Sequence, residues 1–179
     1  MDKSVTIIAD ASFCHQTKLG GYGAWVASSI GKQQFSGLLD KPKDNNTAEI
    51  MAISNALWHG FNSGIILEGF EILIQTDSRS AMQMYEGDIS PKNNQQVKAK
   101  DYVQSLINRY KIKVRYKHVK GHTDRDENRY KAQHHCDQAA RYHMLKAKSE
   151  LLNTSDEFSI DCQKNRMMKK SGYLRMRVR

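Results

Sequence analysis

Apolar and polar positions alternate over short intervals in the first forty residues. Residues 5–9 read Val-Thr-Ile-Ile-Ala, which is typical of a buried central strand, and two further apolar runs, 24–29 and 33–39, each follow a glycine-containing turn. Tight turns between neighbouring runs favour antiparallel pairing. This part of the chain therefore predicts a three-stranded antiparallel meander.

Helical periodicity begins beyond residue 44. Ile50, Ile53 and Leu57 recur on one helix face, and the preceding Asp-Asn-Asn-Thr segment offers N-cap side chains, which predicts a helix over about 45–60. The remaining pattern predicts strands over 69–76 and 112–119 and helices over 78–86, 95–110 and about 129–149. This order predicts an α/β fold: a mixed five-stranded sheet, with three antiparallel strands and then two parallel ones, flanked by helices.

The organised pattern ends near residue 150, so we expect one globular domain over 1–150 and a basic, flexible C-terminal tail over 151–179. From residue 164 onward the chain has seven basic residues and no acid: Lys164, Arg166, Lys169, Lys170, Arg175, Arg177 and Arg179. This tail is either a solvated basic end or a non-specific tether for nucleic acid that acts through counterion release. A third interpretation, in which the apolar residues after position 172 pack as a terminal strand or helix, stays open.

Composition limits the class of protein. A chain of 179 residues can bury a core without disulfides, and its three cysteines, Cys14, Cys136 and Cys162, are widely spaced and fit a reducing compartment. It has no apolar stretch of the ~20 residues that a membrane helix needs and no signal-peptide pattern, so we expect a cytoplasmic protein without a membrane partner. The net charge of +9 and the pI near 9.5 favour a polyanionic partner.

Four carboxylates occupy distinctive places in the predicted elements. Asp10 and Asp77 end two apolar strands, Glu49 lies at the start of the first helix, and Asp137 lies inside the last helix. Any one of them alone would be read as a helix cap or a solvated turn. Together, strand ends and helices can bring four acids to one point, and clustered carboxylates without Cys or His ligands suit Mg²⁺ or Mn²⁺.

The four acids and the segments around them resemble the ribonuclease H family of the type-one, bacterial and eukaryotic kind. The segments are Asn45-Asn46, Thr76-Asp77-Ser78 and Lys120-Gly121-His122, within a match from about Ser4 to about Ala147. The resemblance implies a ribonuclease H-like fold and makes residues 1–150 a catalytic domain. It also implies an endoribonuclease that hydrolyses the RNA strand of RNA–DNA hybrids with two Mg²⁺ ions, which Mn²⁺ can replace, and leaves 5′-phosphate and 3′-hydroxyl ends.

The resemblance assigns catalytic roles to five residues. Asp10 would bridge the two ions, because it lies on the most buried strand and is the most rigidly held. Glu49 and Asp77 would hold the ion on the leaving-group side, and Asp137 would complete the ion that activates water. His122, in a polar loop, would move a proton or assist product release.

The loop that follows His122 departs from the family pattern. Fifteen positions separate His122 from Asp137, several more than in the compact bacterial enzymes, and the intervening segment is unusually charged. Whether Asp126 or Glu127 approaches the metals is left open by the sequence.

Substrate contacts are expected close to the acids. The resemblance implies that Asn45 and Asn46 read bases in the minor groove of the hybrid, although N-capping of the helix is the simpler role. The other residues expected to bind nucleic acid are Ser12, Phe13, Cys14, Arg79 and Lys120.

Two departures from the family bear on hybrid binding. Asp44 stands where the family often has a threonine that holds a DNA phosphate, and an acid would repel that group. The segment 87–96 is too short for the extra helix and basic protrusion with which some members grip the DNA strand. The basic tail could supply positive charge instead.

Two other function classes remain. One is a related nuclease that acts on double-stranded RNA or structured DNA, and the other is a non-catalytic nucleic-acid-binding module. Four mutually repelling carboxylates favour an enzyme over a binding module, because binding alone does not need them. We expect the protein to act as a monomer.

Overall fold

The computed structural model of the chain describes residues 2–120 and 128–175, and it describes side chains over 2–120 and 130–153. The chain divides into two compact units, residues 1–144 and residues 145–179. The first unit contains the β-sheet and all four of the acids singled out above.

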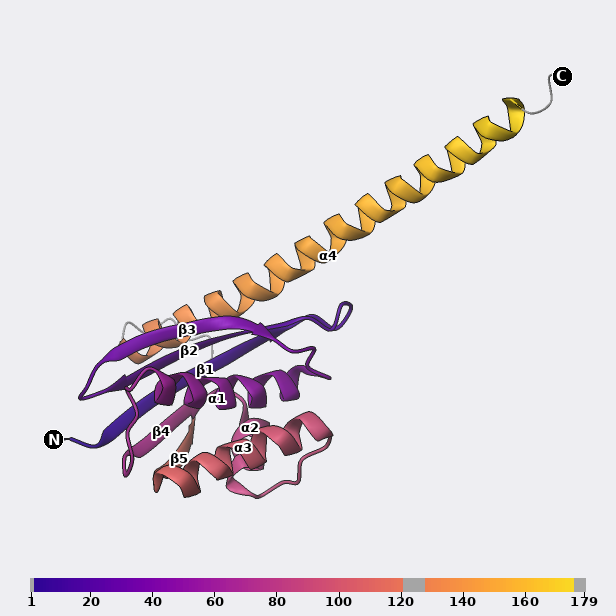
Figure 1. The fold of residues 1–179 in the computed structure, drawn as a ribbon. Coiled ribbons are helices and arrows are strands. Elements are labelled where there is room, and N and C mark those ends of the chain that lie inside the picture. The colour runs from indigo at the N-terminus through magenta and orange to yellow at the C-terminus, as the bar shows by residue number, and fades with distance from the viewer. Residues whose placement is uncertain (1, 121–127, 176–179) are drawn as a thin grey trace. The chain divides into compact units, whose positions relative to one another are not determined.

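The elements follow one another in the predicted order (Figure 1). They are β1 (Ser4–Phe13), β2 (Gly20–Ser28), β3 (Lys32–Leu39), α1 (Asn45–Asn62), β4 (Glu71–Thr76), α2 (Arg79–Glu86), α3 (Asn94–Tyr110), β5 (Lys113–His118) and α4 (Asn128–Arg175). Helices α1, α2 and α3 have the N-cap residues Asp44, Ser78 and Asn93, and each of these side chains accepts a hydrogen bond from the main-chain N–H three residues later. Polar N-caps of this kind explain why the three helices start where they do.

The five strands form one mixed sheet in the order β3-β2-β1-β4-β5. Strand β2 pairs antiparallel with both β1 and β3, whereas β4 pairs parallel with both β1 and β5. This confirms the predicted mixed sheet of three antiparallel strands followed by two parallel ones. Strand β1 lies at the centre, and it pairs with β2 along almost its whole length but with β4 only as far as Ile8.

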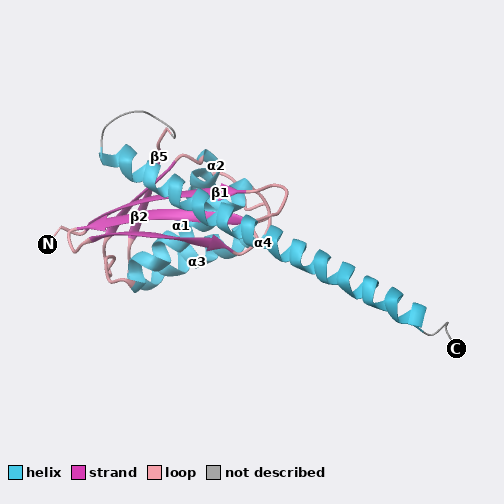
Figure 2. Ribbon diagram, turned by 90° about the horizontal axis from the view of Figure 1, so that it is seen from above, coloured by secondary structure: helices cyan, strands magenta, loops and turns pink. Residues whose placement is uncertain are grey.

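The main core lies on one face of the sheet, under α1, α2 and α3 (Figures 1 and 2). Its fully buried side chains include Ile7, Val26, Ile53, Leu57 and Ile74. Since successive strand residues point to opposite faces, Ile8 belongs to the other face of the sheet.

On that other face, the part of α4 that belongs to the first unit packs against β1 and β2. Ile8 forms a small buried cluster with Ala132 and Cys136 of α4. Two glycines of β2 let the helix come this close, because a Cβ at Gly21 or Gly23 would collide with a main-chain carbonyl oxygen of α4. Helix α4 therefore rests on the backbone of β2, with no β2 side chain at the two contact points.

Helix α4 is longer than the pattern predicted. The sequence pattern predicts a helix that ends near residue 149, but the backbone stays helical to Arg175. Residues 150–171 contain no proline or glycine, so no residue of the helix-breaking types ends the helix earlier. The domain boundary near residue 150 and the flexibility of residues 151–179 stay predictions. Within the part of the chain that the structure describes, no helix has both the length and the apolar character of a membrane span.

Candidate active site

Three of the four acids meet at the carboxyl end of the central strands. Asp10 lies on β1 just beyond its last pairing with β4, Asp77 directly follows β4, and Glu49 lies in the second turn of α1. Each of the three offers a carboxylate oxygen, and these oxygens lie within 4.8 Å of one another. Asp10 and Glu49 are buried and Asp77 is half-buried, so the cluster is a largely desolvated group of acids.

The start of α1, which carries Glu49, is fixed by a connected set of hydrogen bonds. Asp44 Oδ1 accepts from both the N–H and the hydroxyl of Thr47, at 2.7 and 2.8 Å. The Thr47 hydroxyl oxygen in turn accepts from the side-chain amides of Asn93 and Gln96, at 2.9 and 3.0 Å. The network joins the N-termini of α1 and α3 and so holds the backbone on which Glu49 sits.

Both oxygens of Asp10 are hydrogen-bonded. Oδ1 accepts from the N–H of Ala11 at 2.8 Å, and Oδ2 accepts from Nε2 of Gln133 on α4 at 3.2 Å. Burial, followed by the charges of Asp77 and Asp137, raises the pKa of Asp10 to about 7, and the two hydrogen bonds act in the opposite direction. The charged form of Asp10 is therefore destabilised, and a bound cation would stabilise it.

The charged form of Glu49 is destabilised in the same way, and one of its carboxylate oxygens has no hydrogen-bond partner among the described residues. Burial, and then the charges of Asp10 and Asp77, raises the pKa of Glu49 well above its usual range. Its Oε2 is buried and has no hydrogen-bond partner among the described residues. A buried carboxylate oxygen without a donor, beside two other carboxylates, is the arrangement that a hard divalent cation would satisfy.

Asp137 lies close to the three-acid cluster without being one of its members. It is half-buried on α4, and its charge contributes to the raised pKa of both Asp10 and Glu49. The group of oxygens within 4.8 Å, searched over the described residues, consists of Asp10, Glu49 and Asp77. The structure therefore brings all four acids to one region and brings three of them within reach of a single ion.

The predicted proton carrier cannot be placed. His122, Asp126 and Glu127 lie outside the described residues, so their positions relative to the acids stay predictions. Lys120, the last described residue before that segment, is exposed.

The other residues predicted to bind substrate lie around the acidic cluster in sequence and differ in exposure. Asn45 and Asn46 are exposed in the first turn of α1, and Arg79 is exposed at the first position of α2. Ser12, Phe13 and Cys14 are half-buried at the end of β1. The exposed groups are accessible to a ligand, and no contact in the structure assigns them to one.

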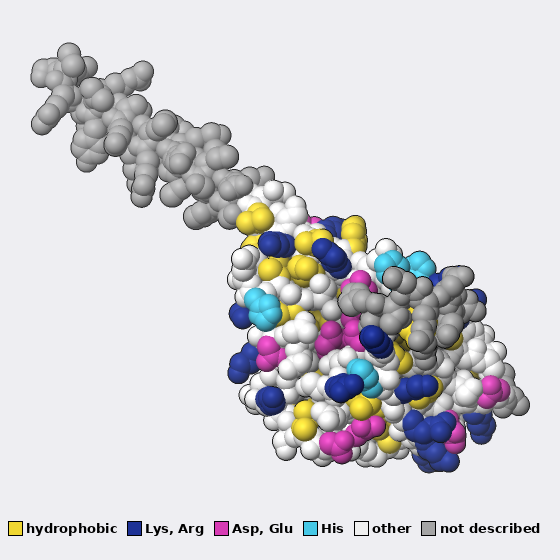
Figure 3. Space-filling view, turned by 180° about the vertical axis from the view of Figure 1, so that it is seen from behind, with side chains coloured by type: hydrophobic (Ala, Val, Ile, Leu, Met, Phe, Trp, Pro, Cys, Tyr) yellow, Lys and Arg dark blue, Asp and Glu magenta, His cyan; other side chains and the backbone are white. Residues whose placement is uncertain are grey.

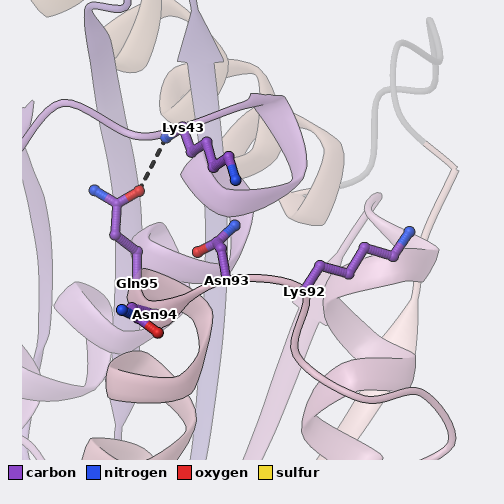
Figure 4. A pocket seen from close by; sticks show the side chains of 5 residues that line it. All are labelled: Lys43, Lys92, Asn93, Asn94 and Gln95. Atoms are coloured by element: carbon purple, nitrogen blue, oxygen red, sulfur yellow. Dashed lines mark hydrogen bonds between the residues drawn. The ribbon is translucent and has the colours of Figure 1, made fainter.

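A pocket of about 430 Å³ opens near the starts of α1 and α3 (Figure 4). Its lining combines two lysines and three side-chain amides: Lys43, Lys92, Asn93, Asn94 and Gln95. The Gln95 amide oxygen accepts from the N–H of Lys43 at 3.0 Å, which ties the two helix starts together across the pocket. The lining has the charge and the donors to receive an anionic group.

Two departures noted in the sequence have a structural counterpart in this region. The Asp44 carboxylate, which would repel a phosphate, accepts hydrogen bonds from Thr47 and acts as the N-cap of α1. Residues 87–93, all of them described, contain no helix, so α3 follows α2 after a short connection. Among the residues that line the pocket, the two lysines carry the positive charge that could attract a phosphate.

Two residues beside the acids were not identified from the sequence. Gln133 contacts Asp10, and it could have been found because it lies four positions before Asp137, on the same helix face. A hydrogen bond of 3.1 Å joins Nε2 of His118 to the main-chain carbonyl oxygen of Asp77, and no sequence signal marks it.

On the face shown in Figure 3, acidic side chains gather with lysine, arginine and histidine side chains nearby.

One family model matches the chain. The sequence profile described as RNase H matches residues 2–144. A search of the curated proteins found no match.

Solved structures share the fold at low sequence identity. RNase H1 from the halophilic archaeon Halobacterium salinarum NRC-1 is 15% identical, with a TM-score of 0.63 over 80% of this chain and 98% of that one. The N-terminal RNase H domain of rv2228c from Mycobacterium tuberculosis is 20% identical, with a TM-score of 0.60 over 79% and 98%. LC11-RNase H1, isolated from compost and solved in complex with an RNA/DNA hybrid, is 15% identical, with a TM-score of 0.65 over 80% and 98%.

Proposed function

The chain belongs to the RNase H family of ribonucleases, and on that premise we propose that it hydrolyses the RNA strand of RNA–DNA hybrids as a metal-dependent endoribonuclease. The observation that carries the proposal is the convergence of Asp10, Glu49 and Asp77 within 4.8 Å in a largely buried site. The hybrid bound to LC11-RNase H1, a protein of the same fold, supports the choice of substrate.

The donor set fits Mg²⁺, with Mn²⁺ as a substitute, because it consists of carboxylate oxygens without sulfur. We propose that these acids would hold two ions: Asp10 would contribute to both, Glu49 and Asp77 to the ion on the leaving-group side, and Asp137 to the other. Such a pair, when bound, would polarise the attacking water and neutralise charge on the phosphate and the leaving oxygen. Burial and the neighbouring carboxylates raise the pKa values of Asp10 and Glu49, and this is the local reason to expect divalent ions here.

The protein's own residues would orient the substrate and move protons. We propose that His122 carries a proton to or from the reacting groups and that cleavage leaves 5′-phosphate and 3′-hydroxyl ends. The exposed Asn45 and Asn46 would contact bases in the wide minor groove of the hybrid. The pocket with Lys43 and Lys92 would receive a backbone phosphate, for which its charge is suited.

A cleavage assay tests the proposal. The full chain is incubated with Mg²⁺, Mn²⁺ or EDTA and with labelled hybrid, double-stranded RNA or duplex DNA, and Asp10→Asn protein prepared in the same way serves as the control. We expect cutting of the RNA strand of the hybrid with either metal and none with EDTA. Extension of the product by a polymerase would identify its 3′-hydroxyl end, and ligation its 5′-phosphate.

The other two function classes give different results in the same assay. A related nuclease would cut double-stranded RNA or structured DNA in preference to the hybrid. A binding module would retain labelled hybrid without cutting it, at any metal concentration. Either outcome would replace the proposed substrate or the proposed activity.

Two further expectations carry over from the sequence. We propose that the protein works as a monomer and that it works in the cytoplasm, where widely spaced cysteines stay reduced. We also propose that residues 151–179 add affinity for nucleic acid through their positive charge.

A further inference from the structure

Gln133 is a buried polar residue at the point where α4 meets the acidic cluster. It is 7% exposed, and its Nε2 lies 3.2 Å from Oδ2 of Asp10. The contact joins two positions 123 residues apart in the sequence. The hydrogen bond favours the charged form of Asp10 and so lowers its pKa, against the larger effects of burial and of the neighbouring acids, which raise it.

The position of Gln133 is set by the backbone of the sheet. The carbonyl oxygen of Cys136 lies against Gly23, and Sγ of Cys136 lies 3.7 Å from the carbonyl oxygen of Ile8. One turn of α4 is thereby fixed to both β1 and β2. Gln133 and Asp137 lie four residues apart, on one face of this fixed turn, and that face is turned to Asp10.

The amide of Gln133 completes the orientation of the Asp10 carboxylate. With Ala11 N–H on Oδ1 and Gln133 Nε2 on Oδ2, both oxygens are held, and the plane of the carboxylate is fixed by a donor on each side. A carboxylate that would serve as a ligand to metal ions is oriented by such outer hydrogen bonds, which reduce its freedom to rotate away from the site.

The other end of the same amide has no partner. Oε1 of Gln133 is buried and accepts no hydrogen bond from any described residue. Leaving a buried amide oxygen unpaired is unfavourable, so such an atom calls for a reason. Oε1 of Gln133 belongs to the amide that contacts Asp10, at a cluster of acids whose charged forms are destabilised by burial and by one another. Divalent ions bound there would bring water molecules with them.

We propose that Gln133 is a positioning residue of the metal centre: its Nε2 orients Asp10 for metal binding, and its Oε1 accepts a hydrogen bond from water held there. The inference rests on the proposed function, since it requires that Asp10 binds a divalent ion. The competing explanation is that Gln133 only links α4 to the sheet, as a structural cross-link.

Gln34, an exposed glutamine, provides a control of the same residue type. Its Nε2 donates to the main-chain carbonyl oxygen of His135 at 3.3 Å, so it also links the sheet to α4 by a glutamine side chain. It does so from β3, and its contact does not involve the carboxylates. Gln133→Met and Gln34→Met each remove one such link while keeping a side chain of similar length.

The test is calorimetric titration of the full chain with Mn²⁺ and with Mg²⁺, in the absence of nucleic acid, together with thermal melting by circular dichroism. We expect Gln133→Met to weaken metal binding roughly 10- to 100-fold, the usual scale for a group that orients a metal ligand. Gln34→Met should bind metal like the wild type. In cleavage assays, excess metal should recover much of the turnover of Gln133→Met, with KM for hybrid unchanged.

A second variant protects the test against misfolding. Gln133→Asn keeps a buried amide but shortens it by one methylene, so the amide no longer reaches Asp10, and metal binding should fall as in Gln133→Met. Wild-type metal affinity in a folded Gln133→Met or Gln133→Asn protein would overturn the inference. If the wild type itself bound no divalent ion, the proposed metal-dependent function would fail instead, so the two failures are distinguishable.

Discussion

Asp10 of β1 pairs with Gly23 of β2, and the missing side chain at Gly23 lets α4 lie directly against this pair of residues. A Cβ at this position would collide with the main-chain carbonyl oxygen of Cys136, the residue before Asp137. The distance between the acids of the sheet and the acid of α4 is therefore set by a glycine that carries no chemistry of its own.

Gly23→Ala should push α4 away from β1 and β2. Overpacking of this kind costs about 1–3 kcal/mol of stability, or more where backbone atoms must move, and it also separates Asp137 and Gln133 from Asp10. We expect a lower melting temperature and a higher Mg²⁺ requirement for cleavage. Gly31→Ala is the control, because a Cβ there meets no atom within 4 Å and should change neither quantity.

The stability of the metal-free protein should fall as the pH rises. Burial and neighbouring charges raise the pKa of Asp10 to about 7 in the folded protein, so the folded state holds this proton more tightly than the unfolded chain. The resulting stabilisation is complete below about pH 4 and is lost as the pH rises through 7, an effect on the order of a few kcal/mol. Thermal melting in EDTA from pH 5 to pH 8 measures it. Added Mg²⁺ should raise the melting temperature more at pH 8 than at pH 5.

Asp10→Asn should remove activity and most of this pH dependence together. The neutral amide removes the cost of burying a charge and the repulsion by Asp77 and Asp137, so the metal-free variant should be more stable than the wild type at pH 8 and by a smaller margin at pH 5. Gln133 can turn its amide so that its unpaired Oε1 accepts from the new side chain. Cleavage should fall by orders of magnitude, since each ~1.4 kcal/mol of lost transition-state stabilisation is a tenfold loss of rate. Near wild-type cutting of hybrid in Mg²⁺ would contradict the two-metal assignment.

His122→Ala should separate proton transfer from metal binding. We expect turnover to fall roughly 10- to 1000-fold, the scale of a positioned proton carrier or somewhat less, with unchanged metal affinity. Calorimetry with Mn²⁺ supplies the second measurement. A comparable loss of metal affinity would make His122 a ligand instead.

Deletion of residues 164–179 tests the basic tail. The truncated protein loses seven positive charges, so it should bind hybrid more weakly at low salt and with a shallower dependence of log affinity on log salt. Each phosphate contact contributes about 0.9 to that slope on duplex DNA, and a tail rarely engages all its charges. Turnover at saturating hybrid should change little. An unchanged salt slope with a lower melting temperature would favour a packed C-terminal segment over a tether.

Local patterns were enough to predict the sheet and three of the acids. Asp10 and Asp77 ended apolar runs, and parallel neighbouring strands bring such ends to one edge of a sheet, so their meeting follows from topology. Glu49 followed a capping segment, and the observed cap at Asp44 has the predicted chemistry. No single acid was distinctive by itself, and the prediction came from the order of the four acids together with their local contexts.

The contacts of α4 could not be predicted in the same way. The hydrogen bond from Gln133 to Asp10 depends on how a helix seats on two strands that are more than a hundred residues away. The glycine-containing turn predicted before residue 24 includes Gly21 and Gly23, whereas in the structure both lie within β2, where they contact α4. The length of α4 was also missed, because apolar periodicity fades beyond residue 149 while no helix-breaking residue intervenes before Gly172.

The separation of Gln133 from Asp10 in the sequence also has a consequence for folding. Contacts between distant positions form late, because the entropy of closing a long loop must be overcome before the contact stabilises anything. Asp10 of β1, Glu49 of α1 and Asp77, which directly follows β4, lie within the first 77 residues, so these acids can come together before α4 has joined them. A nascent chain on the ribosome would thus hold three crowded acids without their amide partner. Divalent ions that bind these acids would then stabilise the folded domain, with α4 in place, even before any nucleic acid is bound.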